Sequence, residues 1–195
     1  MSGLVDGKES VAIGSRAGAA GSSAWRRAAG AAGFALLTAL AARVAVPLPG
    51  TPVPFTLQVV AVLLSGFLLG PRLGAASQAL YLALGMGGLP VFAAGGGAAY
   101  LLGPTGGYLL AFPAASAIAG WFAWRRGGAA LPAIGLVLAL AAIHAGGLAW
   151  LTVLMNPRSA LATGVLPFLP GDLLKLLLVL LIGSRFRDRA LRLLG

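Results

Sequence analysis

The chain has 195 residues, of which 59% are hydrophobic and 9% are charged, and its formal net charge is +10. A soluble domain carries about 25% charged residues to cover its surface, so this composition excludes an ordinary water-soluble protein and indicates an integral membrane protein. The basic residues separate apolar segments and do not form a stripe interleaved with aromatic side chains, which argues against a nucleic-acid partner. The sequence has no cysteine, which excludes disulfides and thiolate metal sites.

The predicted elements begin after a small, polar segment at residues 1–25. This segment lacks the apolar core of a signal peptide, and we interpret it as a mobile tail. About 20 apolar residues cross a bilayer as a helix. On this basis the sequence predicts an all-α membrane domain over residues 26–187 and a basic C-terminal tail over 188–195. The six expected transmembrane helices lie at about 28–46, 55–69, 73–89, 105–124, 131–154 and 168–183.

The distribution of positive charge predicts the orientation of these six spans. If the N-terminus is cytoplasmic, the inner segments carry 11 of the 14 lysines and arginines. The rule that cytoplasmic loops are enriched in Lys and Arg then favours six spans with both termini in the cytoplasm. An odd number of spans would destroy this asymmetry.

The second span and its neighbouring loops predict a cavity on the outer side. At about 1.5 Å per residue, the 15 residues of 55–69 reach roughly 22 Å, less than the ~30 Å hydrocarbon core. The proline-rich loop 47–54 and the glycine-rich loop 90–104 should therefore dip to membrane depth. Irregular backbone at that depth must be buried in protein or line a cavity, so we expect an outward-facing, loop-covered ligand pocket.

Asp172 and Lys175 are the candidate polar groups of this pocket. They are three residues apart and share one face of the sixth helix. Ionisable groups inside a membrane usually face the bundle interior and pair with each other or with a ligand. Two interpretations remain open: a structural ion pair, or a lysine that meets an anionic ligand group beside an aspartate that orients it.

Other polar residues in the spans have competing interpretations. Gln58 suits a urea or amide ligand, or an interhelical hydrogen bond, and the latter is favoured for Gln78. His144 has no second histidine or carboxylate near it in the sequence, so we favour packing or hydrogen bonding over a metal site. Only two carboxylates lie beyond residue 9, and we expect neither a metal nor another cofactor.

Several ordered motifs resemble the BioY family, the biotin-specific S components of energy-coupling factor (ECF) transporters. The resemblance covers residues 30–185. It is carried by PLPGTPVPFTLQ (47–58), GPRLG (70–74), GLPVF (88–92), GPTGGY (103–108) and LPFLPGDLLK (166–175).

The resemblance implies a substrate-binding subunit, not an enzyme, in the bacterial cytoplasmic membrane. Its implied partners are biotin, the lipid bilayer, a transmembrane coupling subunit, and separate ATPase subunits. The implied biotin-binding residues are Asp172, Lys175, Gln58, Phe92, Gly96, Gly97, Thr105, Gly107 and Tyr108. The small-residue face at Ala35 and Ala39 resembles the docking motif for the coupling subunit. Two alternatives stay open: an S component for another vitamin, or a membrane enzyme with Asp172 and Lys175 as an acid–base pair.

Overall fold

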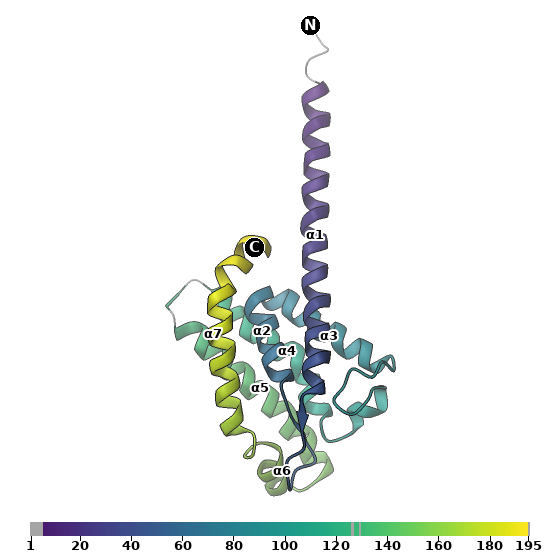
Figure 1. Cartoon of the computed structure of the whole chain (residues 1–195), viewed down its shortest axis with the longest axis vertical. Coiled ribbons are helices and arrows are strands. Elements are labelled where there is room, and N and C mark those ends of the chain that lie inside the picture. Colours follow the sequence, from purple (N-terminus) through teal and green to yellow (C-terminus); the bar gives the residue numbers. More distant parts are fainter. Residues whose placement is uncertain (1–5, 126, 129, 195) are drawn as a thin grey trace.

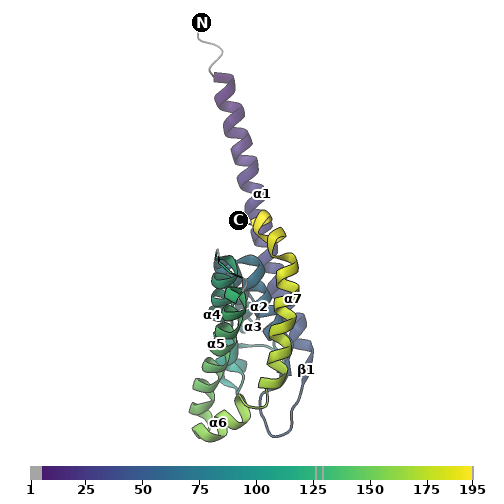
Figure 2. The same cartoon turned by 90° about the vertical axis from the view of Figure 1, so that its left-hand side faces the viewer.

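The protein is a bundle of helices with one helix that projects far beyond the others (Figures 1 and 2). The computed structural model describes residues 6–125, 127–128 and 130–194. The elements are α1 (Asp6–Arg43), β1 (Ala45–Val46), β2 (Phe55–Thr56), α2 (Gln58–Leu69), α3 (Pro71–Met86), the 3-10 helix η1 (Ala98–Leu102), α4 (Gly106–Trp124), α5 (Ala130–Leu154), α6 (Pro157–Gly164) and α7 (Leu169–Leu194).

A helix is present in each of the six predicted ranges, and the structure adds four short elements between them. The sequence did not predict η1, α6 or the antiparallel pair β1–β2, in which Ala45 pairs with Thr56 and Val46 with Phe55. The fold is therefore mostly helical and not strictly all-α. Residues 1–5 of the predicted tail lie outside the described residues. From Asp6 the chain is helical, while α7 continues through the predicted basic tail to Leu194. The mobility of residues 1–25 remains a prediction.

Two described helices, α4 and α5, are long and apolar enough to cross a membrane by length and composition. The pair α6 and α7, bent by 49° where they join, forms a third candidate span, and α2 is a shorter apolar helix. Large hydrophobic side chains are exposed along α5 and α7, among them Val137, Leu174 and Leu181. An exterior of this kind fits lipid and not water.

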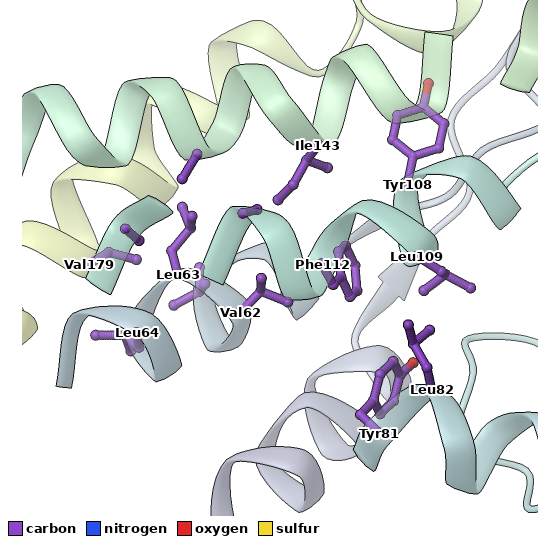
Figure 3. Packing of buried hydrophobic residues seen from close by; sticks show 14 of the residues in the cluster. Val62, Leu63, Leu64, Tyr81, Leu82, Tyr108, Leu109, Phe112, Ile143 and Val179 are labelled. Carbon is purple, nitrogen blue, oxygen red and sulfur yellow. The ribbon is translucent and has the colours of Figure 1, made fainter. Parts of the chain in front are cut away.

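The bundle is held by close helix crossings. A Cβ atom at Gly74 would lie 2.6 Å from Gly66 Cα, and one at Gly120 would lie 2.6 Å from Gly66 O. The backbones of α2, α3 and α4 therefore meet without intervening side chains, as small residues allow in membrane helices. Leu63 of α2 and Phe112 of α4 pack in the core with Ile143 of α5 (Figure 3).

A buried polar cluster joins four of the helices. Gln78 of α3 donates to Ser65 Oγ on α2 at 3.0 Å and accepts a hydrogen bond from Thr38 Oγ1 on α1 at 3.2 Å. Ser65 in turn contacts Ser116 Oγ on α4 at 2.8 Å. Each amide atom of Gln78 thus has a partner, and the interhelical role favoured for Gln78 is confirmed.

Candidate functional site

A cavity is lined by residues near the start of α2, α4 and α7 and by the middle of α5. The start of α7 lies at the end of the bundle opposite the projecting part of α1 (Figure 1). The cavity volume, measured for the centre of a water-sized sphere, is about 60 Å³. One water molecule needs roughly 10–15 Å³ on the same measure. The other residues that line the cavity come from the segments that precede α2, α4 and α7. Its polar lining residues are Thr56, Gln58, Tyr100, Thr105, Tyr108, His144, Asp172 and Lys175. Its apolar lining residues are Val53, Pro54, Val59, Ala93, Leu109, Phe112, Leu140, Ile143 and Phe168.

Asp172 and Lys175 meet in this cavity, on the first turns of α7. Lys175 Nζ donates to Asp172 Oδ1 at 2.9 Å, and the two side chains are 5% and 3% exposed. Burial of two charges is costly unless each is paired and hydrogen-bonded. Their spacing in the sequence correctly placed them on one helix face, and the fold turns that face inward.

His144 of α5 is the second partner of the buried carboxylate. Its Nε2 lies 2.7 Å from Asp172 Oδ2, so both carboxylate oxygens are engaged. The hydrogen-bonding role expected for His144 is therefore correct, but its carboxylate partner was missed because 28 residues separate the two in the sequence. Among the residues that the structure describes, no group of three His, Cys, Asp or Glu could hold a metal.

An aromatic pair supports the lysine from the other side. Lys175 Nζ lies 3.7 Å from the centre of the Phe55 ring, within the range of a cation–π contact. Phe55 stacks on Phe168 with ring centres 6.5 Å apart. Gly171 makes this arrangement possible, because a Cβ atom there would collide with the Phe55 ring. The cation is thus held between Asp172 and an aromatic face.

Gln58 lines the cavity, but its amide is already engaged by the protein. Its Oε1 accepts from Thr56 Oγ1 at 3.1 Å, and its Nε2 donates to Tyr81 Oη at 2.6 Å. Tyr81 donates in turn to the carbonyl of Val91 at 3.2 Å. This chain of hydrogen bonds ties the start of α2 to the loop after α3, so Gln58 shapes the roof of the cavity.

The start of α4 forms another wall. Thr105 and Tyr108 line the cavity, and Tyr108 donates to the carbonyl of Gly164 at 2.6 Å, which joins α4 to the end of α6. The Tyr108 ring also meets His144 edge-on, with ring centres 6.3 Å apart. Gly107 has a packing role, because a Cβ atom there would collide with Gly146 O on α5.

The glycine-rich loop contributes mainly as scaffold. Phe92 is fully buried between Tyr81 and Tyr100, with ring centres 5.5 and 5.0 Å away, and it is Tyr100 that reaches the cavity. Gly97 donates to the carbonyl of Gly85 at 2.7 Å and has a φ of 95°, a conformation that favours glycine. A Cβ atom at Gly96 would collide with the carbonyl of Leu89.

The predicted docking face on α1 lies partly inside the bundle. Ala35 is 2% exposed and belongs to the hydrophobic core, and Ala39 packs against that core. Ala28, Ala32 and Gly33 are exposed. By helical spacing, Ala28 and Ala32 share a face with Ala35 and Ala39, so this small-residue face is exposed toward the start of α1 and is covered by the bundle farther along the helix.

The structure is that of a helical membrane protein whose bundle holds, at one end, a cavity lined by Lys175, Asp172 and His144. The BioY family model matches residues 14–192, and the chain belongs to the BioY family.

Individual relatives agree with this membership. The probable biotin transporter BioY of Pyrococcus horikoshii is 40% identical over 155 residues, which cover 79% of this chain and 91% of the relative. The biotin transporter BioY of Thermotoga maritima is 40% identical over 156 residues, again 79% and 91% of the two chains. A crystal structure of the S-component for biotin from an ECF-type ABC transporter superposes with a TM-score of 0.76 at 28% identity, covering 84% of this chain and 91% of that one.

Proposed function

We propose that this protein binds biotin and serves as the substrate-specificity subunit of an ECF-type transporter. The observation that carries the proposal is the buried Lys175–Asp172–His144 group in a mostly apolar cavity. Biotin has a carboxylate for a cation, a ureido ring for hydrogen-bonding side chains, and a bicyclic body with an aliphatic chain for apolar walls. The names of the relatives support this ligand over another vitamin.

Titration of the purified, detergent-solubilised full chain with biotin tests the proposal. We expect saturable binding with one biotin per chain, measured by isothermal calorimetry. Thiamin and riboflavin are the matched ligands, because either would bind if the protein were an S component for another vitamin. Absence of heat with biotin, at protein concentrations where the sample remains monodisperse, would overturn the proposal.

The same sample separates a binding subunit from a membrane enzyme. A binding subunit returns biotin unchanged after long incubation, as mass spectrometry of the released ligand would record. An enzyme that used Asp172 and Lys175 as an acid–base pair would instead return a product. We infer a binding role because the relatives are named as biotin transporters, and because Asp172 already accepts hydrogen bonds from both Lys175 and His144, which it holds in the cavity wall.

We further propose six spans, formed by α1 to α5 and α7, in the bacterial cytoplasmic membrane with both termini cytoplasmic. The support is the charge asymmetry of the sequence, with 11 of its 14 basic residues on one side. The start of α1 and the end of α7 also lie at the same end of the bundle (Figures 1 and 2). The cavity then opens toward the outer face.

Uptake would require a coupling subunit and ATPase subunits, and we propose α1 as the docking helix. Its exposed small residues Ala28 and Ala32 lie one turn apart on one face and would allow close approach of a partner helix. Ala35 is buried and would be reached only after a rearrangement of α1. Loss of co-purification with the coupling subunit in an Ala32→Trp variant, with biotin binding retained, is the test.

A further inference from the structure

His144 has one ring nitrogen that the protein leaves without a partner. Its Nε2 lies 2.7 Å from Asp172 Oδ2, while its Nδ1 is buried and makes no hydrogen bond with any described residue. His144 lines the ligand cavity on α5, and its side chain is 13% exposed. An unsatisfied buried polar atom is costly, and in a site that awaits a ligand it indicates what the ligand must supply.

The neighbours of His144 fix which nitrogen carries the hydrogen. An ionised carboxylate can only accept hydrogen bonds, so Nε2 must be the protonated nitrogen that donates to Asp172. The single negative charge of Asp172 is already paired with Lys175 at 2.9 Å. In the tautomer that carries its hydrogen on Nε2, the other ring nitrogen, Nδ1, is an acceptor.

We infer that His144 Nδ1 accepts a hydrogen bond from an N–H group of the ligand, and that His144 is a specificity-determining residue of the site. This inference rests on the proposed biotin-binding function, in which the ureido ring supplies two N–H donors. Asp172 then acts through His144 by holding the imidazole in the tautomer that recognises a donor. A ligand without an N–H at this position would leave Nδ1 unsatisfied.

Two substitutions divide the functions of the two ring nitrogens. In His144→Gln the side-chain amide can reach the position of Nε2 and still donate to Asp172, but it supplies no acceptor near Nδ1. In His144→Asn the shorter amide can place its oxygen near Nδ1, while the bond to Asp172 is lost. Each variant keeps the hydrogen-bonding position of one ring nitrogen and loses the other, so the two variants are controls for each other.

The experiment titrates the wild-type chain and both variants with biotin and with the two biotin derivatives methylated at one ureido nitrogen. For wild type we expect one of the derivatives to bind at least about tenfold more weakly than biotin, as loss of one buried hydrogen bond implies. In His144→Gln biotin itself should bind about tenfold more weakly, and the difference between biotin and that derivative should disappear. In His144→Asn the difference should persist.

The outcomes separate this inference from the proposed function. If wild type binds biotin and both methylated derivatives equally well, the inference is overturned without reference to any variant. A derivative that loses affinity equally in wild type and His144→Gln also overturns it, because methyl bulk and not Nδ1 would then be responsible. If wild type binds no biotin, the proposed function fails first and the inference fails with it.

Discussion

At the scale of single residues, Lys175 is the candidate cation for an anionic group of the ligand. It is 5% exposed, lies 2.9 Å from Asp172 and is covered by the Phe55 ring. We expect Lys175→Ala to weaken biotin binding by roughly 10- to 100-fold, because a charge-assisted hydrogen bond contributes about 1.5–3 kcal/mol. Asp172→Asn should weaken it as well, since it removes the charge that holds both Lys175 and His144. Calorimetric titration measures both effects.

The control for these variants is another cation at the same end of the bundle. Arg158 is exposed on α6, so Arg158→Ala should leave biotin affinity unchanged within about twofold. Wild-type affinity in Lys175→Ala and in Asp172→Asn would contradict the prediction and assign the pair a purely structural role. Thermal unfolding of each variant establishes that a loss of affinity is not a loss of fold.

The candidate site was predictable where it depends on local spacing. Asp172 and Lys175 are three residues apart, and helical geometry alone puts them on one face. His144 could not be assigned to them, because its approach to Asp172 depends on how α5 packs beside α7. The motif residues Phe92 and Gly107 are each next in the sequence to a residue that lines the cavity. Phe92 itself is enclosed by other aromatic rings, and Gly107 packs against α5. A conspicuous motif does not distinguish a ligand contact from the packing that supports one.

At the scale of elements, long apolar helices were predictable and short polar ones were not. α4 and α5 begin and end within one residue of the expected spans. The strands β1 and β2 have two residues each, too few for any periodicity to be visible. α6 did carry a signal: Asn156 caps it through the Ser159 amide, and Pro157 occupies its first turn. An N-cap followed by proline is typical of a helix start, but α6 is too short and too polar to be a span.

The crossing of α2 with α3 and α4 gives a prediction about stability. A Cβ atom at Gly66 would collide with the carbonyl of Ser116, which is backbone and cannot rotate away. We expect Gly66→Ala to lower the free energy of unfolding by about 1–3 kcal/mol, the usual cost of overpacking a tight core. Scanning fluorimetry in detergent should record a lower melting temperature.

Gly33 supplies the matched control for Gly66. It also lies inside a helix, but a Cβ atom there would meet nothing within 4 Å. Gly33→Ala should leave the melting temperature unchanged or raise it slightly, because alanine is the better helix former by about 0.5–1 kcal/mol. Equal effects of the two substitutions would mean that the α2–α4 crossing does not limit stability.

At the scale of the whole molecule, composition predicted the membrane class and charge predicted an orientation. The orientation can be checked cleanly because the chain contains no cysteine, so each introduced thiol is the sole target. Ala94 is exposed in the loop after α3, and Gly128 is exposed between α4 and α5, with nothing within 4 Å of a Cβ atom there. With six spans and cytoplasmic termini, these two positions face opposite sides of the membrane. In intact cells a membrane-impermeant maleimide should therefore label Ala94→Cys, and it should label Gly128→Cys only after permeabilisation.

The cysteine-free chain controls for background, and biotin uptake by the labelled strains controls for folding. The reverse pattern would mean an inverted protein with its cavity toward the cytoplasm. Labelling of both positions in intact cells would instead contradict the assignment of α4 as a complete span, because the two positions stand on either side of it.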